Sequence, residues 1–167
     1  MSASISKTTT SPSAAKTILL SGFVAGTLDM LGAILVYSVI MKKVTAVQVL
    51  HGIASGAFGK TAVGGPAIMA LIGLAFHFII AYCFAIGYFI VYPHIPFLHK
   101  HKIIIGLLYG IFVWAVMNLI VVPMSNAYHG PFAWPSAIRA ASILMICIGL
   151  PISLITSRYY SSKQHRS

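Results

Sequence analysis

Three long runs without a charged residue constrain the fold of this chain more than any other feature. Residues 61–99, 103–138 and 140–157 contain no Asp, Glu, Lys or Arg over 39, 36 and 18 positions. A helix needs about 20 mostly apolar residues to cross a hydrocarbon core about 30 Å thick. Two of the runs exceed that length and the third comes close to it. The sequence therefore predicts a polytopic membrane protein.

The overall composition excludes several other classes of protein. Of the 167 residues, 59% are hydrophobic and only 7% are charged, and the mean hydropathy is +0.94. A soluble domain carries about a quarter charged residues. Eleven Lys and Arg stand against a single acid, Asp29. A nucleic-acid-binding domain gathers its basic residues on one wet face, whereas here they punctuate apolar runs. We expect neither a soluble enzyme nor a nucleic-acid partner.

The fold class that follows is all-α, with four transmembrane helices in one domain over residues 17–160. Lipid offers the backbone no hydrogen-bond partners, and the alternating pattern of a membrane barrel is missing. Residues 1–16 are rich in Ser and Thr and predict a mobile polar tail. Residues 161–167 predict a basic C-terminal tail. The four predicted spans cover residues 17–41, 66–92, 103–124 and 136–157.

The segment between the first two spans has a different character. Residues 44–58 are moderately apolar, contain Gly52 and Gly56, and run towards the helix-breaking sequence at 64–66. The segment is too short and too broken to cross a bilayer. We predict a short interfacial or re-entrant helix there.

The distribution of Lys and Arg predicts the orientation. With four spans, the N-terminus, the 93–102 loop and the C-terminus share one side, with seven basic residues against four on the other. The side richer in Lys and Arg is usually cytoplasmic. Tyr128, Phe132 and Trp134 form an aromatic cluster on the opposite side, typical of a membrane boundary. We expect cytoplasmic termini.

Glycine pairs spaced four residues apart predict close helix packing. Such a pair lies on one helix face and lets two backbones approach each other. Two interpretations stay open: a homo-oligomer interface, or packing inside a single bundle. The pairs within predicted spans are Gly22 with Gly26 and Gly106 with Gly110.

Polar residues at membrane depth are candidates for a functional site. They are Asp29, His77, Asn118 and Arg139. Asp29 shares a helix stripe with Gly22 and Gly26, so it is expected to face protein. In one interpretation it forms an ion pair with Arg139 or a hydrogen bond with His77. In the other, these residues form an intramembrane site that takes up and releases protons.

Motifs for catalysis, metal binding or cofactor binding are missing. With one Asp and no Glu, the chain lacks paired carboxylates, a phosphate loop and a magnesium-binding set. We expect no enzyme activity, no cofactor and no metal site. The loop at 93–102 contains three His, but Lys100 and Lys102 beside them repel a cation. Its positive charge favours binding to anionic lipid headgroups.

The order of several motifs resembles a known family. Gly22-Phe23-Val24-Ala25-Gly26 opens the first span. His77 is followed by Gly87-Tyr88, and Gly106-Leu107-Leu108-Tyr109-Gly110 is followed by Pro123. This combination resembles the YagU-like group of bacterial inner-membrane proteins. The resemblance implies an inner-membrane location, a multi-span helical fold and no established activity.

The chain also departs from that family pattern. The pattern has no acid at the position of Asp29, and a His can stand at the position of Asn118. His77 and Asn118 therefore form a candidate shared polar pair. The function expected from the sequence is a structural or regulatory membrane component. The alternative is a small proton-linked transporter or channel-like unit that uses Asp29 and His77.

Overall fold

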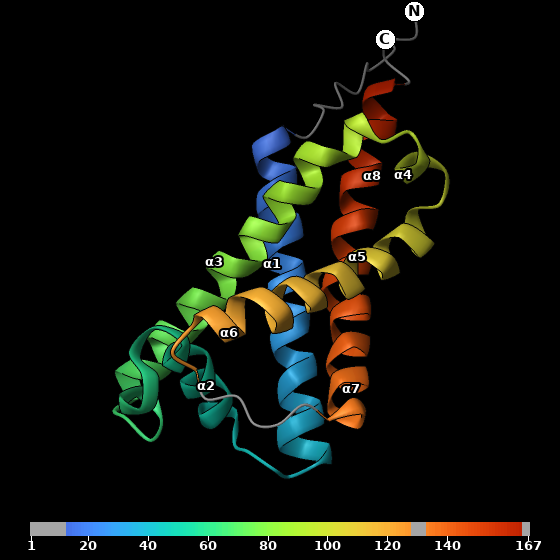
Figure 1. The fold of residues 1–167 in the computed structure, drawn as a ribbon. Coiled ribbons are helices and arrows are strands. Elements are labelled where there is room, and N and C mark those ends of the chain that lie inside the picture. The colour runs from blue at the N-terminus through green and yellow to red at the C-terminus, as the bar shows by residue number, and fades with distance from the viewer. Residues whose placement is uncertain (1–12, 128–132, 165–167) are drawn as a thin grey trace, which may run out of the picture.

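The computed structural model describes residues 13–127 and 133–164, and within them the chain is helical without a strand (Figure 1). The predicted all-helical class is confirmed. Four helices are long and apolar enough to cross a membrane, as the uncharged runs predict. They have 27, 28, 23 and 30 residues and cover Ala14–Ile40, Ala67–His94, Lys102–Met124 and Trp134–Lys163.

Each long helix is built from shorter regular segments. The first consists of α1 (Ala14–Ala33) and a π-helical segment, Ile34–Ile40. The second consists of α3 (Ala67–Val91) and a 3₁₀ turn, Tyr92–His94. The third contains α5 (Lys102–Val116), a π-helical turn (Met117–Val121) and α6 (Val122–Met124). The fourth contains α7 (Trp134–Leu144), a π-helical turn (Met145–Gly149) and α8 (Leu150–Gln164). Shorter connecting helices are α2 (Ala46–Phe58), the 3₁₀ turn Gly59–Ala62, and α4 (Phe97–Lys100).

Both ends of the chain are more helical than expected. Helix α1 begins at Ala14 because Ser13 caps it: Oγ of Ser13 accepts the backbone N–H of Lys16 at 3.2 Å. The polar tail predicted over 1–16 is therefore wrong at its last three residues. Likewise, α8 runs to Gln164, so the predicted basic tail begins as helix. Residues 1–12, Tyr128, Phe132 and residues 165–167 lie outside the described part.

Helix α2 lies within residues 44–58, where the sequence predicts a short interfacial or re-entrant helix, and its placement relative to a membrane stays a prediction. Thr45 and Gln48 cap its start with reciprocal hydrogen bonds. Its last carbonyls are satisfied from the third long helix: the backbone N–H of Asn126 donates to Gly56 O at 2.9 Å, and Nδ2 of Asn126 donates to Ala57 O at 3.1 Å. These contacts tie α2 to the end of α6 and leave it beside the first half of α3 (Figure 1).

The arrangement of the long helices separates the molecule into two ends. In Figure 1, α1 and α3 cross closely, α5 runs obliquely across them, and α8 continues the line of α7. The start of α1, helix α4 and the end of α8 lie at one end of the molecule. Helix α2, α6 and the start of α7 lie at the other end. The start of α1 and the end of α8 thus share a side with the 93–102 loop, the arrangement that four crossings require.

The glycine pairs lie at contacts between helices of the same chain. A side chain at Gly22 would meet the Tyr82 ring, and a Cβ at Gly26 would come within 3.0 Å of the Phe78 ring. These two glycines therefore let α1 pack against α3. Gly106 faces the backbone of Gly149 across the α5–α8 contact, and Gly110 faces that of Met145. Packing within one bundle accounts for both pairs.

A seam of small hydroxyl residues joins α1 to α8. All of its members are at most 4% exposed: Thr17, Ser21 and Ser157. Several of these hydroxyls donate to backbone carbonyls, such as Ser21 to Ile18 at 3.1 Å and Ser157 to Leu154 at 3.0 Å. Small side chains allow the two helices to approach closely, and the internal hydrogen bonds remove most of the cost of burying hydroxyls.

Candidate functional site: an intramembrane cavity

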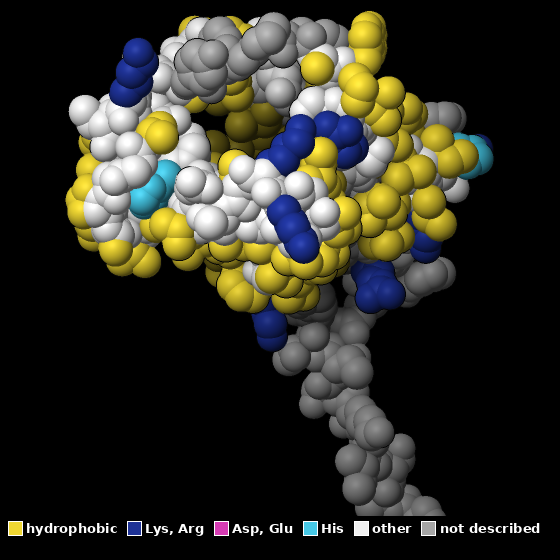
Figure 2. Space-filling model, turned by 90° about the horizontal axis from the view of Figure 1, so that it is seen from below, with side chains coloured by type: hydrophobic (Ala, Val, Ile, Leu, Met, Phe, Trp, Pro, Cys, Tyr) yellow, Lys and Arg dark blue, Asp and Glu magenta, His cyan; other side chains and the backbone are white. Residues whose placement is uncertain are grey.

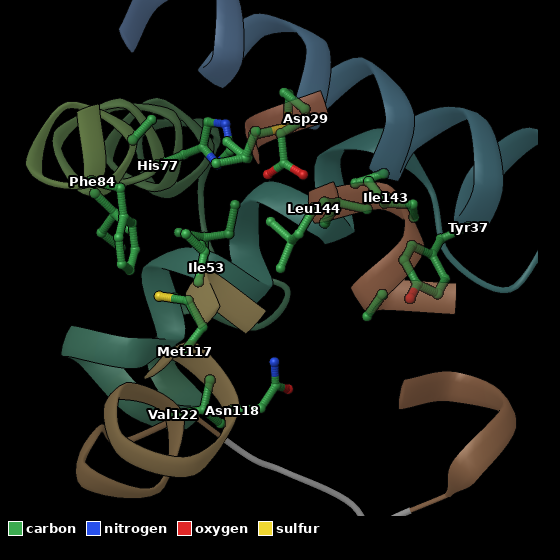
Figure 3. A pocket seen from close by; sticks show the side chains of 18 residues that line it. Asp29, Tyr37, Ile53, His77, Phe84, Met117, Asn118, Val122, Ile143 and Leu144 are labelled. Carbon is green, nitrogen blue, oxygen red and sulfur yellow. The ribbon is translucent and has the colours of Figure 1, made fainter. Parts of the chain in front are cut away.

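A cavity of about 310 Å³ lies between the four long helices and α2. Its volume falls at the lower end of the range for small-molecule sites, which is about 300–1,000 Å³. Most of its wall is apolar. The apolar side chains that Figure 3 labels around it are Ile53, Phe84, Met117, Val122, Ile143 and Leu144.

Asp29 supplies the negative charge of this cavity. It lies on α1, one turn before the π-helical segment, and its carboxylate points into the cavity (Figure 3). The side chain is half-buried. Within the described part of the chain, it forms neither a hydrogen bond nor an ion pair. The carboxylate is therefore available to a ligand or a proton.

His77 lies beside Asp29 and is held by the first long helix. Its Nε2 lies 2.8 Å from the carbonyl oxygen of Gly26. A carbonyl only accepts, so Nε2 carries the proton and Nδ1 remains able to accept one. The imidazole and the Asp29 carboxylate are close enough to interact electrostatically. The structure thus brings together the acid and the His that the sequence singled out.

The other two polar residues expected at this depth have different positions. Asn118 also lines the cavity, but its Nδ2 donates to Trp114 O at 2.9 Å within its own helix. Arg139 is not part of the cavity wall. Its Nε is buried without a hydrogen-bond partner among the described residues. One interpretation of the sequence gave Asp29 either an ion pair with Arg139 or a hydrogen bond with His77, and neither forms among the described residues, since Nε2 of His77 bonds Gly26 O.

Tyr37 is a cavity residue that the sequence analysis missed. It lies on the π-helical segment of the first long helix, and its side chain lines the cavity (Figure 3). It is close enough to both Asp29 and Arg139 to interact with them electrostatically. The tyrosine follows Asp29 by eight residues, slightly more than two helical turns. This spacing is the sequence feature that could have identified Tyr37 as a neighbour of Asp29.

The three π-helical segments all contribute to the cavity wall. Tyr37 belongs to the first, Met117 and Asn118 to the second, and Ile148 to the third. Such segments occur mainly at functional positions in helices. They widen the helix by one residue and re-aim the side chains that follow.

Prolines explain two of these segments. Pro123 and Pro151 lack a backbone N–H, and their rings would clash with the carbonyl four residues earlier. In each case the residue before the proline bonds five residues back: Val122 N–H to Met117 O, and Leu150 N–H to Met145 O. The wider turn accommodates the ring. Both prolines thus lie next to the turns that line the cavity.

The end of the molecule opposite the chain termini is hollowed. Figure 2 shows a hollow with a hydrophobic interior on this end, with Lys or Arg side chains at its edge. Four elements that line the cavity lie at this end in Figure 1: α2, the end of the first long helix, the turn before α6, and α7.

The polar groups of this cavity suit an organic cation better than a metal ion. Among the described residues, no group of three His, Cys, Asp or Glu side chains converges. A single carboxylate in apolar walls instead matches a ligand with one positive charge and an apolar body.

The chain matches no protein-family model, no curated protein and no solved structure.

Proposed function

We propose that this protein is a small multi-pass membrane transporter that exchanges protons for an apolar monovalent cation, such as an organic amine. The observation that carries the proposal is the Asp29 carboxylate, which points into an apolar cavity with no cationic partner. Ionisable residues at membrane depth usually line substrate or proton pathways. The proposal develops the transporter alternative from the sequence.

Competition for one carboxylate provides the coupling. When Asp29 is ionised, it binds the cation, and when it is protonated, the attraction for the cation is lost. One proton therefore exchanges for one monovalent cation, and the charge of the cavity is conserved. The titratable groups that face Asp29 are His77, Tyr37 and Cys147.

The environment of the protein completes the proposal. We place it in a bacterial inner membrane with cytoplasmic termini, and α2 at the opposite membrane interface. Seven basic residues on the side of the termini support this orientation. Membership of the YagU-like group is part of the same proposal and is supported by the order of the glycine, histidine and proline motifs.

Transport by purified protein in liposomes tests the function. The probe is benzyltrimethylammonium, whose permanent charge prevents unaided crossing. We expect a proton gradient to drive its accumulation, and Asp29→Asn to abolish that flux. Asp29→Glu keeps the charge and should retain part of the flux. His77→Ala should reduce it, because the neighbouring proton acceptor is lost.

Two controls separate charge recognition from simple partitioning. Neopentylbenzene has the shape of the probe without its charge, so binding to the cavity should fall sharply. Gly52→Ala serves as a control variant, since no atom lies within 4 Å of its added Cβ. Equal flux through wild type and Asp29→Asn would contradict the proposal. A structural or regulatory subunit predicts neither flux nor charge-selective binding.

A further inference from the structure

A second cavity of about 420 Å³ lies on the outside of the bundle, between α3 and α5. Cys83 and Gly87 line it from α3, and Leu108 and Phe112 line it from α5. All four residues are exposed, so the cavity is a groove that faces the surrounding membrane. Leu98 of α4 closes one end of it, near the chain termini.

The groove presents no free hydrogen-bonding hydroxyl to an occupant. Two tyrosines border it, and both hydroxyl groups are already engaged. Tyr88 donates to Ser153 Oγ at 2.9 Å, and Tyr109 donates to the carbonyl of Phe84 at 2.7 Å. The occupant that fits this surface is a hydrocarbon chain.

The length of the groove matches one leaflet of a bilayer. From Lys102 at the start of α5 to Phe112, ten residues rise about 15 Å. Half of a hydrocarbon core is also about 15 Å. An acyl chain in the groove would therefore reach from the membrane surface to the bilayer centre, with its headgroup beside the start of α5.

Two lysines without an acidic side chain to pair with lie where that headgroup would be. Lys100 ends α4, Lys102 begins α5, and both are exposed. The only acidic side chain of the protein is Asp29, which lies in the other cavity. No carboxylate side chain can therefore pair with these lysines. Phosphate groups of lipids are the natural partners of such basic residues.

We propose that the groove between α3 and α5 binds an anionic phospholipid, with one acyl chain along Gly87 and Leu108 and the phosphate at Lys100 and Lys102. The site is separate from the Asp29 cavity and does not depend on transport. It would fix the position of the α4 loop at the membrane surface.

Native mass spectrometry of the full-length protein tests this site. Purified protein is mixed with equal amounts of phosphatidylglycerol and phosphatidylcholine that carry the same acyl chains. We expect wild type to retain one phosphatidylglycerol in preference to phosphatidylcholine. Lys100→Gln with Lys102→Gln should lower that preference by about tenfold or more, since each basic residue near an anionic headgroup contributes about fivefold. Gly87→Phe should reduce binding of both lipids, because the new ring fills the groove.

Matched variants elsewhere control for general effects. Gly52→Phe also places a ring where no atom lies within 4 Å of the Cβ, but on α2. Lys42→Gln with Lys43→Gln removes two charges at the opposite end. Circular dichroism reports whether each variant keeps its helices, and Cys83→Phe replaces Gly87→Phe if the latter is poorly folded.

Two results would overturn the proposal. One is that wild type binds both lipids equally. The other is that the control variants lower phosphatidylglycerol retention as much as the groove variants do. Selective loss in the groove variants alone supports the site. Because none of these measurements requires flux, a failure here is distinguishable from a failure of the transport proposal.

Discussion

At the residue scale, glycine positions differ sharply in how much room they have. A Cβ at Gly110 would meet the backbone of Met145, which cannot rotate away. Gly87 also lies within a long helix, but no atom lies within 4 Å of its Cβ position. The two glycines look alike in the sequence, and only the neighbouring helix makes one of them indispensable.

We expect Gly110→Ala to destabilise the protein by about 1–3 kcal/mol, because the added methyl forces α5 away from the fourth long helix. Gly87→Ala should leave stability unchanged or raise it by up to about 1 kcal/mol, since alanine favours a helix. Unfolding in mixed micelles, followed by circular dichroism, measures both. Equal stability of the two variants would contradict the packing described for α5.

At the scale of single elements, α2 depends on contacts with residues far along the chain. Its start is capped locally by Thr45 and Gln48, which the sequence carries within four positions. Its end is held by Asn126, almost 70 residues later. Since α2 contributes Val49 and Ile53 to the Asp29 cavity, the Asn126 contact also maintains the cavity wall.

We expect Asn126→Ala to speed hydrogen exchange in the last turn of α2, because Ala57 O loses its side-chain donor. The effect should amount to about 1 kcal/mol of local stability, the usual contribution of one hydrogen bond. Hydrogen–deuterium exchange with mass spectrometry measures it. Asn118→Ala is the control, because that amide bonds only within its own helix. Unchanged exchange in α2 would show that the Asn126 side chain does not hold it.

At the scale of the whole molecule, the two ends differ in what they carry. One end has the start of α1, the end of α8, and α4, with Lys100 and Lys102 beside it. The other has α2 and the hollow with the hydrophobic interior (Figures 1 and 2). The orientation in the membrane therefore decides from which side the proposed cation enters.

We expect a cysteine at Ser162 to stay unlabelled by an impermeant reagent in intact cells, and one at Lys60 to be labelled. Both positions are exposed and lie in opposite halves of the molecule. The native Cys83 and Cys147 are first replaced by Ala. Labelling at Ser162 without labelling at Lys60 would reverse the orientation and place the hollow on the cytoplasmic side.

The main features of the fold followed from local properties of the chain. The four long helices were predictable, because charge is costly in lipid and the uncharged runs show where an apolar helix can cross. The exact ends were less predictable. Ser13 extends the first helix, and α8 continues into the basic tail, because capping and helix propagation depend on single residues.

The candidate site was predictable only in part. Asp29 and His77 were identified because ionisable residues are costly at membrane depth. Tyr37 was missed, and neither the ion pair with Arg139 nor the hydrogen bond with His77 that one interpretation offered to Asp29 is formed among the described residues. Side-chain partners depend on the rotation of each helix about its axis. Pro123 and Pro151 change that rotation, because the turn before each of them is wider than an α-helical turn. The sequence alone does not show which side chains then face the neighbouring helices.

The sequence by itself determined that this protein is helical, apolar and able to cross a membrane four times, because those properties sum over residues one at a time. Only the tertiary structure decided that the glycine pairs pack within one chain and that α2 closes a cavity over Asp29. It also decided that Lys100 and Lys102 lie away from Asp29, the only acidic side chain. These are relations between distant residues, and they arise when close helix packing fixes which faces meet.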